Sequence, residues 1–330
     1  KHPYPVTKLK WGACTTQLGK PSLFDAAKKT WRVVISSDTN TNYLAFAPSV
    51  VAHWKRRGIE VSLGLVVTKA DSKAKVDGLV RALKEATEMD IRVLPIEGKI
   101  GLPTGHAAKL ARAFMATQFD DDDVVTIMDI DYYLLWFEQW SAHLKCTPED
   151  GLLALGYNRY GGTVDEGKYP MYLGTAKSSV FSKFLNPDRE ASFETWIQRF
   201  KDIHVFDSKE SPFSHWGQFS DESLFRALLS RSPLPTVWVN TPTSWKRIDR
   251  AHSHPVSNSE LSIAADVFPN RPLDVCKTYN ERLRPVHRFL GIEDPNREKN
   301  FINALIELNV QNRDWGQGRF KKTSTLENCV

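Results

Sequence analysis

The feature that most constrains this fold is an alternation of apolar runs and amphipathic segments over roughly the first 130 residues. The apolar runs predict strands at 31–37, 59–67, 91–96 and 124–128, and the segments between them predict helices at 47–58, 71–86 and 104–119. Neighbouring parallel strands need such crossover connections, and a helix is the usual one. The pattern therefore predicts an α/β fold with a mostly parallel central sheet and flanking helices.

The later part of the chain is more mixed and richer in aromatic residues. Strands, turns and helices are predicted there at 151–162, 170–185, 192–200, 220–231, 236–240 and 296–310. With 330 residues, 41% of them hydrophobic, the chain is long enough for one large domain or two closely joined lobes around a sizeable core.

Composition narrows the classes of partner. The net charge of +5 is small and no long basic block is present, so nucleic acid is not a predicted partner. No apolar run reaches about 18 residues, so no transmembrane segment is predicted. The four cysteines match no zinc-binding spacing and do not make a disulfide scaffold, although one or two bridges are compatible with them.

Acidic residues follow two of the predicted strands. Asp38 comes after the first strand, and Asp129 and Asp131 come after the fourth. Ligands of open parallel sheets bind beyond the carboxyl ends of the strands, so these acids are expected to face one crevice. In an extended segment Asp129 and Asp131 point the same way, with Ile130 turned into the core. Two such carboxylates favour a cation that prefers oxygen ligands, Mn²⁺ or Mg²⁺.

Two other acidic features have a structural interpretation. The run Asp120–Asp123 precedes the fourth strand, at the end of the sheet away from the crevice, and predicts a solvent-exposed turn. Asp71 stands before a predicted helix and is a plausible N-cap.

The placement and order of these motifs resemble those of a GT-A-fold glycosyltransferase. The resemblance rests on the first strand and helix, on VVTIMDID with its Asp-X-Asp, and on the later segments SDES and KRIDRAHSHP, which together span residues 31 to about 256. It implies a Rossmann-like fold with a mixed acceptor-binding half. It also implies transfer of a sugar from a nucleoside diphosphate sugar, UDP-linked by preference, to a hydroxyl of a glycan or glycoconjugate.

The resemblance implies a metal site. In that family the Asp-X-Asp binds Mn²⁺ or Mg²⁺, which bridges the two phosphates of the donor. Asp131 is then a direct ligand, and Asp129 lies near the ribose or the metal. A later histidine is often a further ligand, and His252 and His254 both qualify.

The same resemblance implies contacts to the nucleotide. Asp38 would contact the uracil or the ribose, and His106 and Lys109 would lie over the phosphates or the sugar. Lys246 and Arg250, just before the histidines, would hold the diphosphate as it leaves. A solvated helix face is the competing interpretation for His106 and Lys109, and a plain turn for Asp38.

The catalytic acid is expected at the start of the helix in SDES. Asp221 is the better helix cap, and Glu222 matches the family position better. In an inverting enzyme this carboxylate accepts the proton of the acceptor hydroxyl, and inversion is slightly favoured over retention. Aromatic side chains near these motifs are candidates for stacking on the acceptor sugar: Trp216, Phe219, Tyr160, Tyr132 and Tyr133.

The resemblance also predicts an organisation. Residues 1–30 form a polar, irregular leader on the surface, 31–145 the nucleotide-sugar-binding half, 146–260 the acceptor-binding and catalytic half, and 261–330 an extension of the same globule. The sequence does not fix the compartment. A missing upstream anchor would suggest the Golgi lumen, and without one the cytoplasm is expected.

Other functions remain open from the sequence. A phosphotransferase or phosphatase can also use Asp-X-Asp, but its motif follows the first strand rather than the fourth. A sugar-nucleotide pyrophosphorylase would carry a glycine-rich signature near the N-terminus, which this sequence lacks. A non-catalytic carbohydrate-binding protein would account for the aromatic residues but not for the paired acids.

Overall fold

The computed structural model describes the parts of the chain that form the central sheet and most of its helices. The described residues are 6–10, 21–28, 30–98, 103–155, 173–201, 222, 224–225, 228, 234–240, 246–248, 256–262, 264–267, 281, 283–292 and 294–311.

An eight-stranded sheet forms the centre of the molecule. Its strands lie in the order β1 (Val6–Lys10), β9 (Thr236–Asn240), β7 (Leu152–Leu155), β8 (Leu173–Lys177), β5 (Val124–Met128), β2 (Trp31–Ser37), β3 (Glu60–Thr68) and β4 (Asp90–Ile96). Of these eight, β8 alone runs antiparallel to its neighbours. The prediction of a mostly parallel sheet is confirmed.

Two hydrophobic clusters cover the two faces of the sheet, and the alternation of side chains along the strands separates them. On β2, Val33 and Ile35 belong to one cluster and Val34 to the other. The first cluster takes residues from α1 (Leu23–Ala27), α2 (Thr41–Leu44), α3 (Ala47–Lys55), α4 (Lys73–Thr87), α6 (Phe137–Leu144), α10 (Asn258–Leu261), α12 (Arg284–Leu290) and α13 (Pro295–Gln311). The second takes residues from α5 (Thr104–Met115), α7 (Ser178–Leu185) and α8 (Phe193–Lys201).

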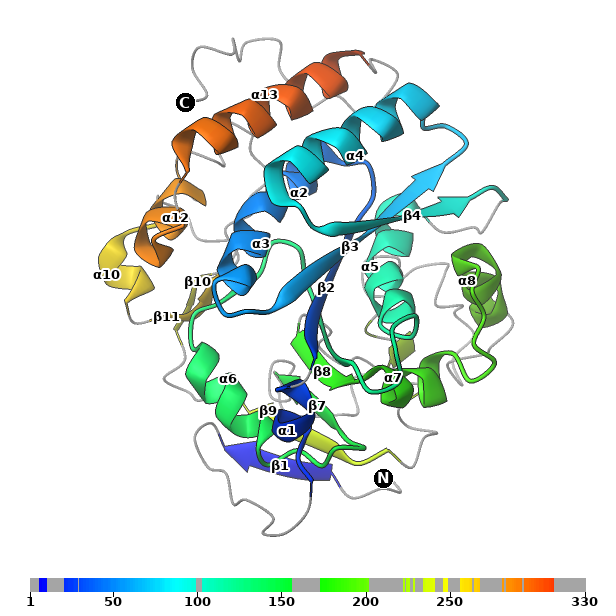
Figure 1. Cartoon of the computed structure of the whole chain (residues 1–330), viewed down its shortest axis with the longest axis vertical. Helices are drawn as coiled ribbons and strands as arrows, with labels where there is room; N and C mark the ends of the chain where they lie inside the picture. The colour runs from blue at the N-terminus through cyan, green and yellow to red at the C-terminus, as the bar shows by residue number, and fades with distance from the viewer. Residues whose placement is uncertain are drawn as a thin grey trace, which may run out of the picture.

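The C-terminal helix belongs to the same globule. α13 lies beside α4 across one face of the sheet (Figure 1), and its Phe301, Ile302 and Leu305 are buried in the first cluster. The helix predicted at 296–310 is therefore confirmed. No helix among the described residues is long and apolar enough to cross a membrane.

A second, three-stranded sheet joins β10 (Lys246–Ile248), β11 (Ala264–Val267) and β6 (Tyr133–Leu134). β11 pairs in parallel with β10 and antiparallel with β6. Because β6 begins two residues after Asp131, this small sheet ties the segment after the Asp-X-Asp to the later part of the chain.

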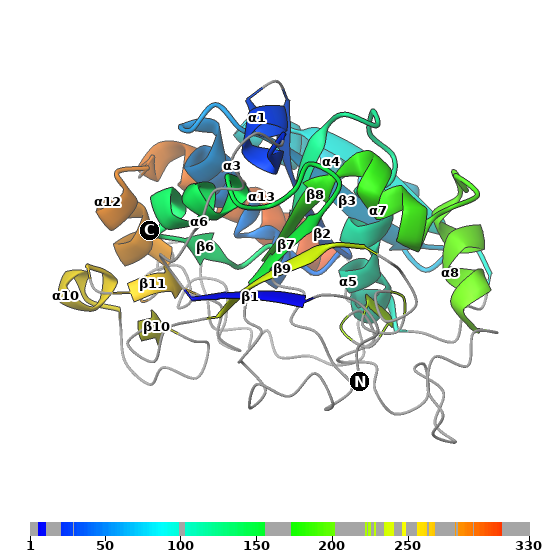
Figure 2. The ribbon, with the colours of Figure 1, turned by 90° about the horizontal axis from the view of Figure 1, so that it is seen from below.

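The N-terminal region differs from the predicted irregular leader. Val6–Lys10 forms β1, which pairs with β9 at one edge of the main sheet (Figure 2). Leu23–Ala27 forms α1, with Ser22 as its N-cap and Leu23 fully buried. Edge strands are often short and polar, and β1 has two lysines among five residues, which hides its apolar pattern. The predicted division of the chain into halves stays a prediction.

Other local predictions also need correction. Ser72, not Asp71, caps α4, since its side chain accepts the Lys75 N–H. α3 ends at Lys55, and Gly58 lies beyond it at φ +71°, a conformation that glycine adopts without steric cost. The cysteines need no such correction: Cys146 is disulfide-bonded, in agreement with the prediction that one or two bridges are compatible with the sequence, and the other three cysteines lie outside the described residues.

The run Asp120–Asp123 is not simply a solvated turn. Asp123 is buried and receives a hydrogen bond from Arg32 Nε at 2.9 Å. Asp121 pairs with Arg189 and Asp122 with Lys177. The predicted location is confirmed, since the run precedes β5 at the amino end of the parallel strands. Its role there is to tie neighbouring elements together through ion pairs.

Candidate functional site

The strand order predicts a ligand-binding crevice between the carboxyl ends of β2 and β5. From β2 the chain moves outward to β3 and β4 on one side, and then crosses to β5 on the other side. Such a reversal leaves the loops after the two central strands on opposite faces, which opens the usual ligand-binding crevice of an α/β sheet. Val34 pairs with Ile127 near the end of these strands. Asp38 and Asp131 each follow that pair by four residues.

Asp38 is held in a defined position at this crevice. It is 8% exposed, and its Oδ1 accepts the backbone N–H of Asn40 at 3.0 Å. Its Oδ2 faces the first turn of α5, because a Cβ atom built on Gly105 would lie 3.5 Å from it. Burial raises the pKa of the Asp38 carboxyl, and the nearby Asp71 carboxylate raises it further, while Lys75 lowers it. Asp38 therefore lowers the stability of the folded protein when its carboxyl group is ionised.

This cost gives a prediction for stability. The pKa of Asp38 is higher in the folded than in the unfolded protein, so the folded protein binds the carboxyl proton more tightly. Stability therefore falls as pH rises from the unfolded-state pKa to the folded-state pKa of this carboxyl. Asp38→Asn has no charge to desolvate and keeps an acceptor for Asn40. We expect it to raise the melting temperature at pH 7, with a gain that vanishes below the unfolded-state pKa near 3.8, as measured by calorimetry across pH. A melting temperature of Asp38→Asn at pH 7 that is equal to or below that of the wild type would contradict this prediction.

Asp129 is paired with a buried cation. Arg112, on α5, forms an ion pair with Asp129 Oδ1, and their side chains are 4% and 24% exposed. The two residues come from the helix before β5 and the loop after it, so the pair fixes the first acid of the Asp-X-Asp against α5. Asp129 therefore carries a compensated charge.

Asp131 is almost completely buried, at 1% exposure. The segment before it is a turn rather than an extended strand, because the Tyr132 N–H donates to the Asp129 carbonyl at 3.2 Å. Contrary to the prediction from the sequence, Asp129 and Asp131 are therefore not alternate residues of an extended strand. Ile130 does pack into the first hydrophobic cluster, as predicted.

α3 anchors the chain directly after Asp131. Ser49 Oγ and the Tyr133 hydroxyl share a hydrogen bond, and His53 Nε2 lies 3.1 Å from the Leu134 carbonyl oxygen. Burial lowers the pKa of His53 to about 3, helped by Arg57, so the ring is neutral at physiological pH and donates its Nε2–H to that carbonyl. Tyr132 and Tyr133 are fully buried, so their proposed role in stacking on an acceptor is wrong.

The acids of this crevice suit a hard cation. Oxygen ligands are those that Mg²⁺ and Mn²⁺ prefer, and Mg²⁺ that also binds substrate phosphates is commonly held by one or two carboxylates. Within the described residues, no group of three or more His, Cys, Asp and Glu side chains comes together in a way that would hold a metal. Asp129 and Asp131 are two carboxylates separated by one residue, and their role as metal ligands stays a prediction. His252 and His254 lie outside the described residues.

Of the remaining predicted site residues, the structure describes the side chains of three, His106, Lys109 and Glu222. His106 and Lys109 lie in the first two turns of α5, the helix whose Gly105 faces Asp38, and both are partly buried. Glu222 is partly buried, and the neighbouring Leu224 and Phe225 pack into the second hydrophobic cluster, with Phe225 against Phe184 of α7. The others have no described side chain: Asp221, Trp216, Phe219, Tyr160, Lys246, Arg250, His252 and His254.

Sequence reasoning missed three charged residues beside the crevice. Arg112 neutralises Asp129, and Asp71 and Lys75 form a buried ion pair behind Asp38. A spacing of four residues between an acid and a base at a helix start was the available signal for the second pair. No comparable signal marks Arg112, because its partner is 17 residues away in a different element.

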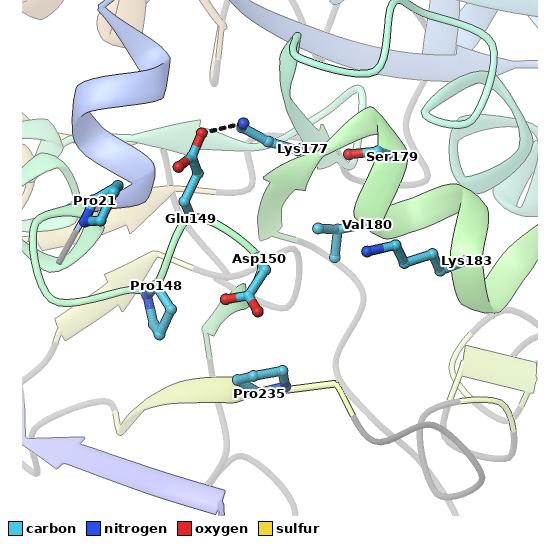
Figure 3. A pocket seen from close by; sticks show the side chains of 9 residues that line it. All are labelled: Pro21, Pro148, Glu149, Asp150, Lys177, Ser179, Val180, Lys183 and Pro235. Carbon is cyan, nitrogen blue, oxygen red and sulfur yellow. Dashed lines mark hydrogen bonds and ion pairs between the residues drawn. The ribbon is translucent and has the colours of Figure 1, made fainter.

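A groove of about 700 Å³ opens at the opposite end of the sheet. It lies at the amino ends of β7 and β9, next to Glu149 and Pro235, with Lys183 of α7 on its wall (Figure 3). Lys177 on its wall is already paired with Glu149 and Asp122. The position of this groove at the amino ends separates it from the crevice that the strand order predicts.

The chain has weak overall likeness to glycosyltransferases of known structure. No protein-family model and no curated protein sequence matches it. The galactosyltransferase LgtC, solved with donor and acceptor sugar analogues, shares 14% identity over 82% of this chain and 99% of its own, with a TM-score of 0.42. Values this low do not assign the chain to a family.

Two further structures show the same level of similarity. The glycosyltransferase GlyE of Streptococcus pneumoniae shares 13% identity over 86% of this chain and 64% of its own, with a TM-score of 0.40. A mannosyltransferase of Pyrobaculum calidifontis, solved with GDP-mannose and Mn²⁺, shares 13% identity over 93% of this chain and 91% of its own, with a TM-score of 0.33. The chain's own residues and topology therefore have to carry a functional assignment.

Proposed function

We propose that this protein is a metal-dependent glycosyltransferase of the GT-A type, which moves a sugar from a nucleoside diphosphate sugar to a hydroxyl group of a glycan or glycoconjugate. One observation carries the proposal. Asp38 and the Asp129–Asp131 turn follow the two central strands at the point where the strand order reverses, and the N-terminal turn of α5 faces Asp38.

These groups complement the parts of a nucleoside diphosphate. The Asp38 carboxylate can accept hydrogen bonds from the donor groups of a base or a ribose. A helix N-terminus carries partial positive charge and suits an anionic diphosphate, and His106 and Lys109 lie in the first two turns of α5. Arg112 keeps the charge of Asp129 compensated, which limits repulsion between that acid and the phosphates.

Asp129 and Asp131 would hold a Mn²⁺ or Mg²⁺ ion, together with His252 or His254, and the bound ion would neutralise charge on the departing diphosphate. The ligand-bearing turn is held by the residues that follow it. Ser49 and His53 anchor Tyr133 and Leu134 to α3, so Asp131 is presented on a fixed segment. A UDP-linked donor is the preferred version of this proposal.

Glu222, or Asp221 beside it, would act as the general base. Its carboxylate takes the proton from the acceptor hydroxyl, the hydroxyl oxygen attacks the anomeric carbon of the donor sugar, and the nucleoside diphosphate leaves with the electrons of the broken bond. Attack on the face opposite the leaving group inverts the anomeric configuration, and this is the favoured outcome. Trp216, Phe219 and Tyr160 would offer ring faces to the acceptor sugar.

A thermal-shift screen tests the proposed function. UDP-sugars, GDP-sugars and ADP-sugars are each added with Mn²⁺ and with EDTA, and free sugars serve as controls. We expect a nucleoside diphosphate sugar with Mn²⁺ to raise the melting temperature, and the rise to be largely lost with EDTA, because ligand that binds only the folded state stabilises it by mass action. The proposal would be contradicted if free sugars alone raised the melting temperature, or if none of the nucleotide sugars raised it.

A further inference from the structure

A buried hydrogen-bonded network lies directly behind Asp38. The Asp71 and Lys75 side chains are 5% and 4% exposed, and Lys75 Nζ lies 3.1 Å from Asp71 Oδ1. The Thr39 hydroxyl connects the two, since it donates to Asp71 Oδ1 at 2.7 Å and accepts from Lys75 Nζ at 3.0 Å. Thr39 itself is 3% exposed.

The network joins three elements at the carboxyl end of the sheet. Thr39 follows β2, Asp71 follows β3, and Lys75 lies in the first turn of α4. Asp71 Oδ2 also accepts the backbone N–H of Thr68, the last residue of β3, at 3.0 Å. The loop that carries Asp38 is therefore attached to the neighbouring strand and helix by side-chain bonds.

The Asp71 carboxyl of this network has a lowered pKa. Burial raises the pKa of Asp71, but hydrogen bonds from Thr39, Thr68 and Lys75 outweigh that effect and lower it overall. A buried ion pair of this kind contributes little net stability compared with apolar residues, because both charges lose their hydration. Its location beside Asp38 indicates that it instead fixes the conformation of the loop that carries Asp38.

The Asp38 side chain is positioned by a short-range hydrogen bond. Its Oδ1 is held by the Asn40 N–H, and the residue between them in the chain is Thr39. A hydroxyl bonded at once to a carboxylate and an ammonium group fixes the rotamer of its own side chain and the backbone at that position. Removal of this hydroxyl is expected to loosen the turn 38–40 without removal of any charge.

We propose that Thr39, held by the Asp71–Lys75 ion pair, is a positioning residue that aims the Asp38 carboxylate at the nucleoside end of the donor. This inference rests on the proposed function. Thr39 touches no reacting atom in this scheme and acts only through Asp38. It therefore affects recognition of the base or ribose and not of the diphosphate.

The test compares Thr39→Val with Thr39→Ser. Valine keeps the shape but loses the hydroxyl, and serine keeps the hydroxyl. Calorimetry measures the affinity of each variant for UDP, for GDP and for pyrophosphate, all with Mn²⁺. We expect Thr39→Val to weaken binding of the preferred nucleotide by about fivefold, the scale of the net contribution of one hydrogen bond, and Thr39→Ser to stay within twofold of the wild type. Pyrophosphate affinity should be the same in all three proteins.

A second background separates positioning from general damage. In Asp38→Asn protein, the further change Thr39→Val should cost less than twofold in nucleotide affinity, because its route of action is already impaired. An equal loss in both backgrounds, an unchanged affinity of Thr39→Val, or a matching loss for pyrophosphate would each overturn the inference. Wild-type protein that binds neither UDP nor GDP would instead reject the proposed function, and this inference with it.

Discussion

Asp131→Asn is expected to lower the rate of sugar transfer by at least about a hundredfold at saturating acceptor, the scale on which loss of one preorganised charge-stabilising group acts. Asp131 is 1% exposed, and asparagine has nearly the same shape as aspartate, so the substitution changes the charge with little change of volume. It removes the negative charge that would attract a divalent ion and, through it, the diphosphate. Initial rates with the nucleotide sugar selected by thermal shift, measured across Mn²⁺ concentrations, check the prediction.

Another aspartate, on the other side of β5 in the sequence, supplies a matched control. Asp120 is exposed and lies at the amino end of β5, so Asp120→Asn makes the identical chemical change at the opposite end of the sheet. We expect this control to keep wild-type transfer and wild-type dependence on Mn²⁺. Circular dichroism and melting curves of both variants establish that they are folded. Undiminished turnover in folded Asp131→Asn would remove Asp131 from the metal site.

The sheet is the part of this fold that its sequence predicts well. β2, β3, β4 and β5 lie within one residue of the predicted apolar runs. β2, β3 and β5 are largely buried, and such parallel strands need nearly continuous apolar sequence. β6 could not be predicted in this way. It has two residues, Tyr133 and Leu134, and it exists because β11 supplies its partner from about 130 residues further along the chain.

The site is predictable to the level of which loops contribute acids. Asp38 and Asp131 follow two neighbouring strands, β2 and β5, as predicted, because the alternation of strands and helices sets this topology. Their role at a ligand site stays a prediction. Their surroundings depend on long-range packing. Arg112 could equally have been an exposed helix residue by its sequence, and Asp71 has the local pattern of a helix cap. Only the arrangement of α5 against the loop after β5 reveals that Arg112 is buried and paired.

Arg112→Met is expected to lower the free energy of unfolding by about 3 kcal/mol, as removal of one partner from a buried ion pair leaves the other charge uncompensated. Arg112 is 4% exposed and Asp129 24%, so water screens the remaining carboxylate only in part. Asp129→Asn should also be destabilising, because it removes the carboxylate that pairs with the more deeply buried guanidinium. Urea unfolding at neutral pH measures both effects.

The double variant distinguishes an ion pair from two independent packing defects. If the charges stabilise each other, Arg112→Met with Asp129→Asn costs less than the sum of the single changes, by about 1 kcal/mol or more. Arg189 and Asp121 form an exposed pair, 45% and 64% accessible, so Arg189→Met is the control and should cost under about 1 kcal/mol. Additive single effects at Arg112 and Asp129 would mean that the first acid of the Asp-X-Asp does not depend on Arg112.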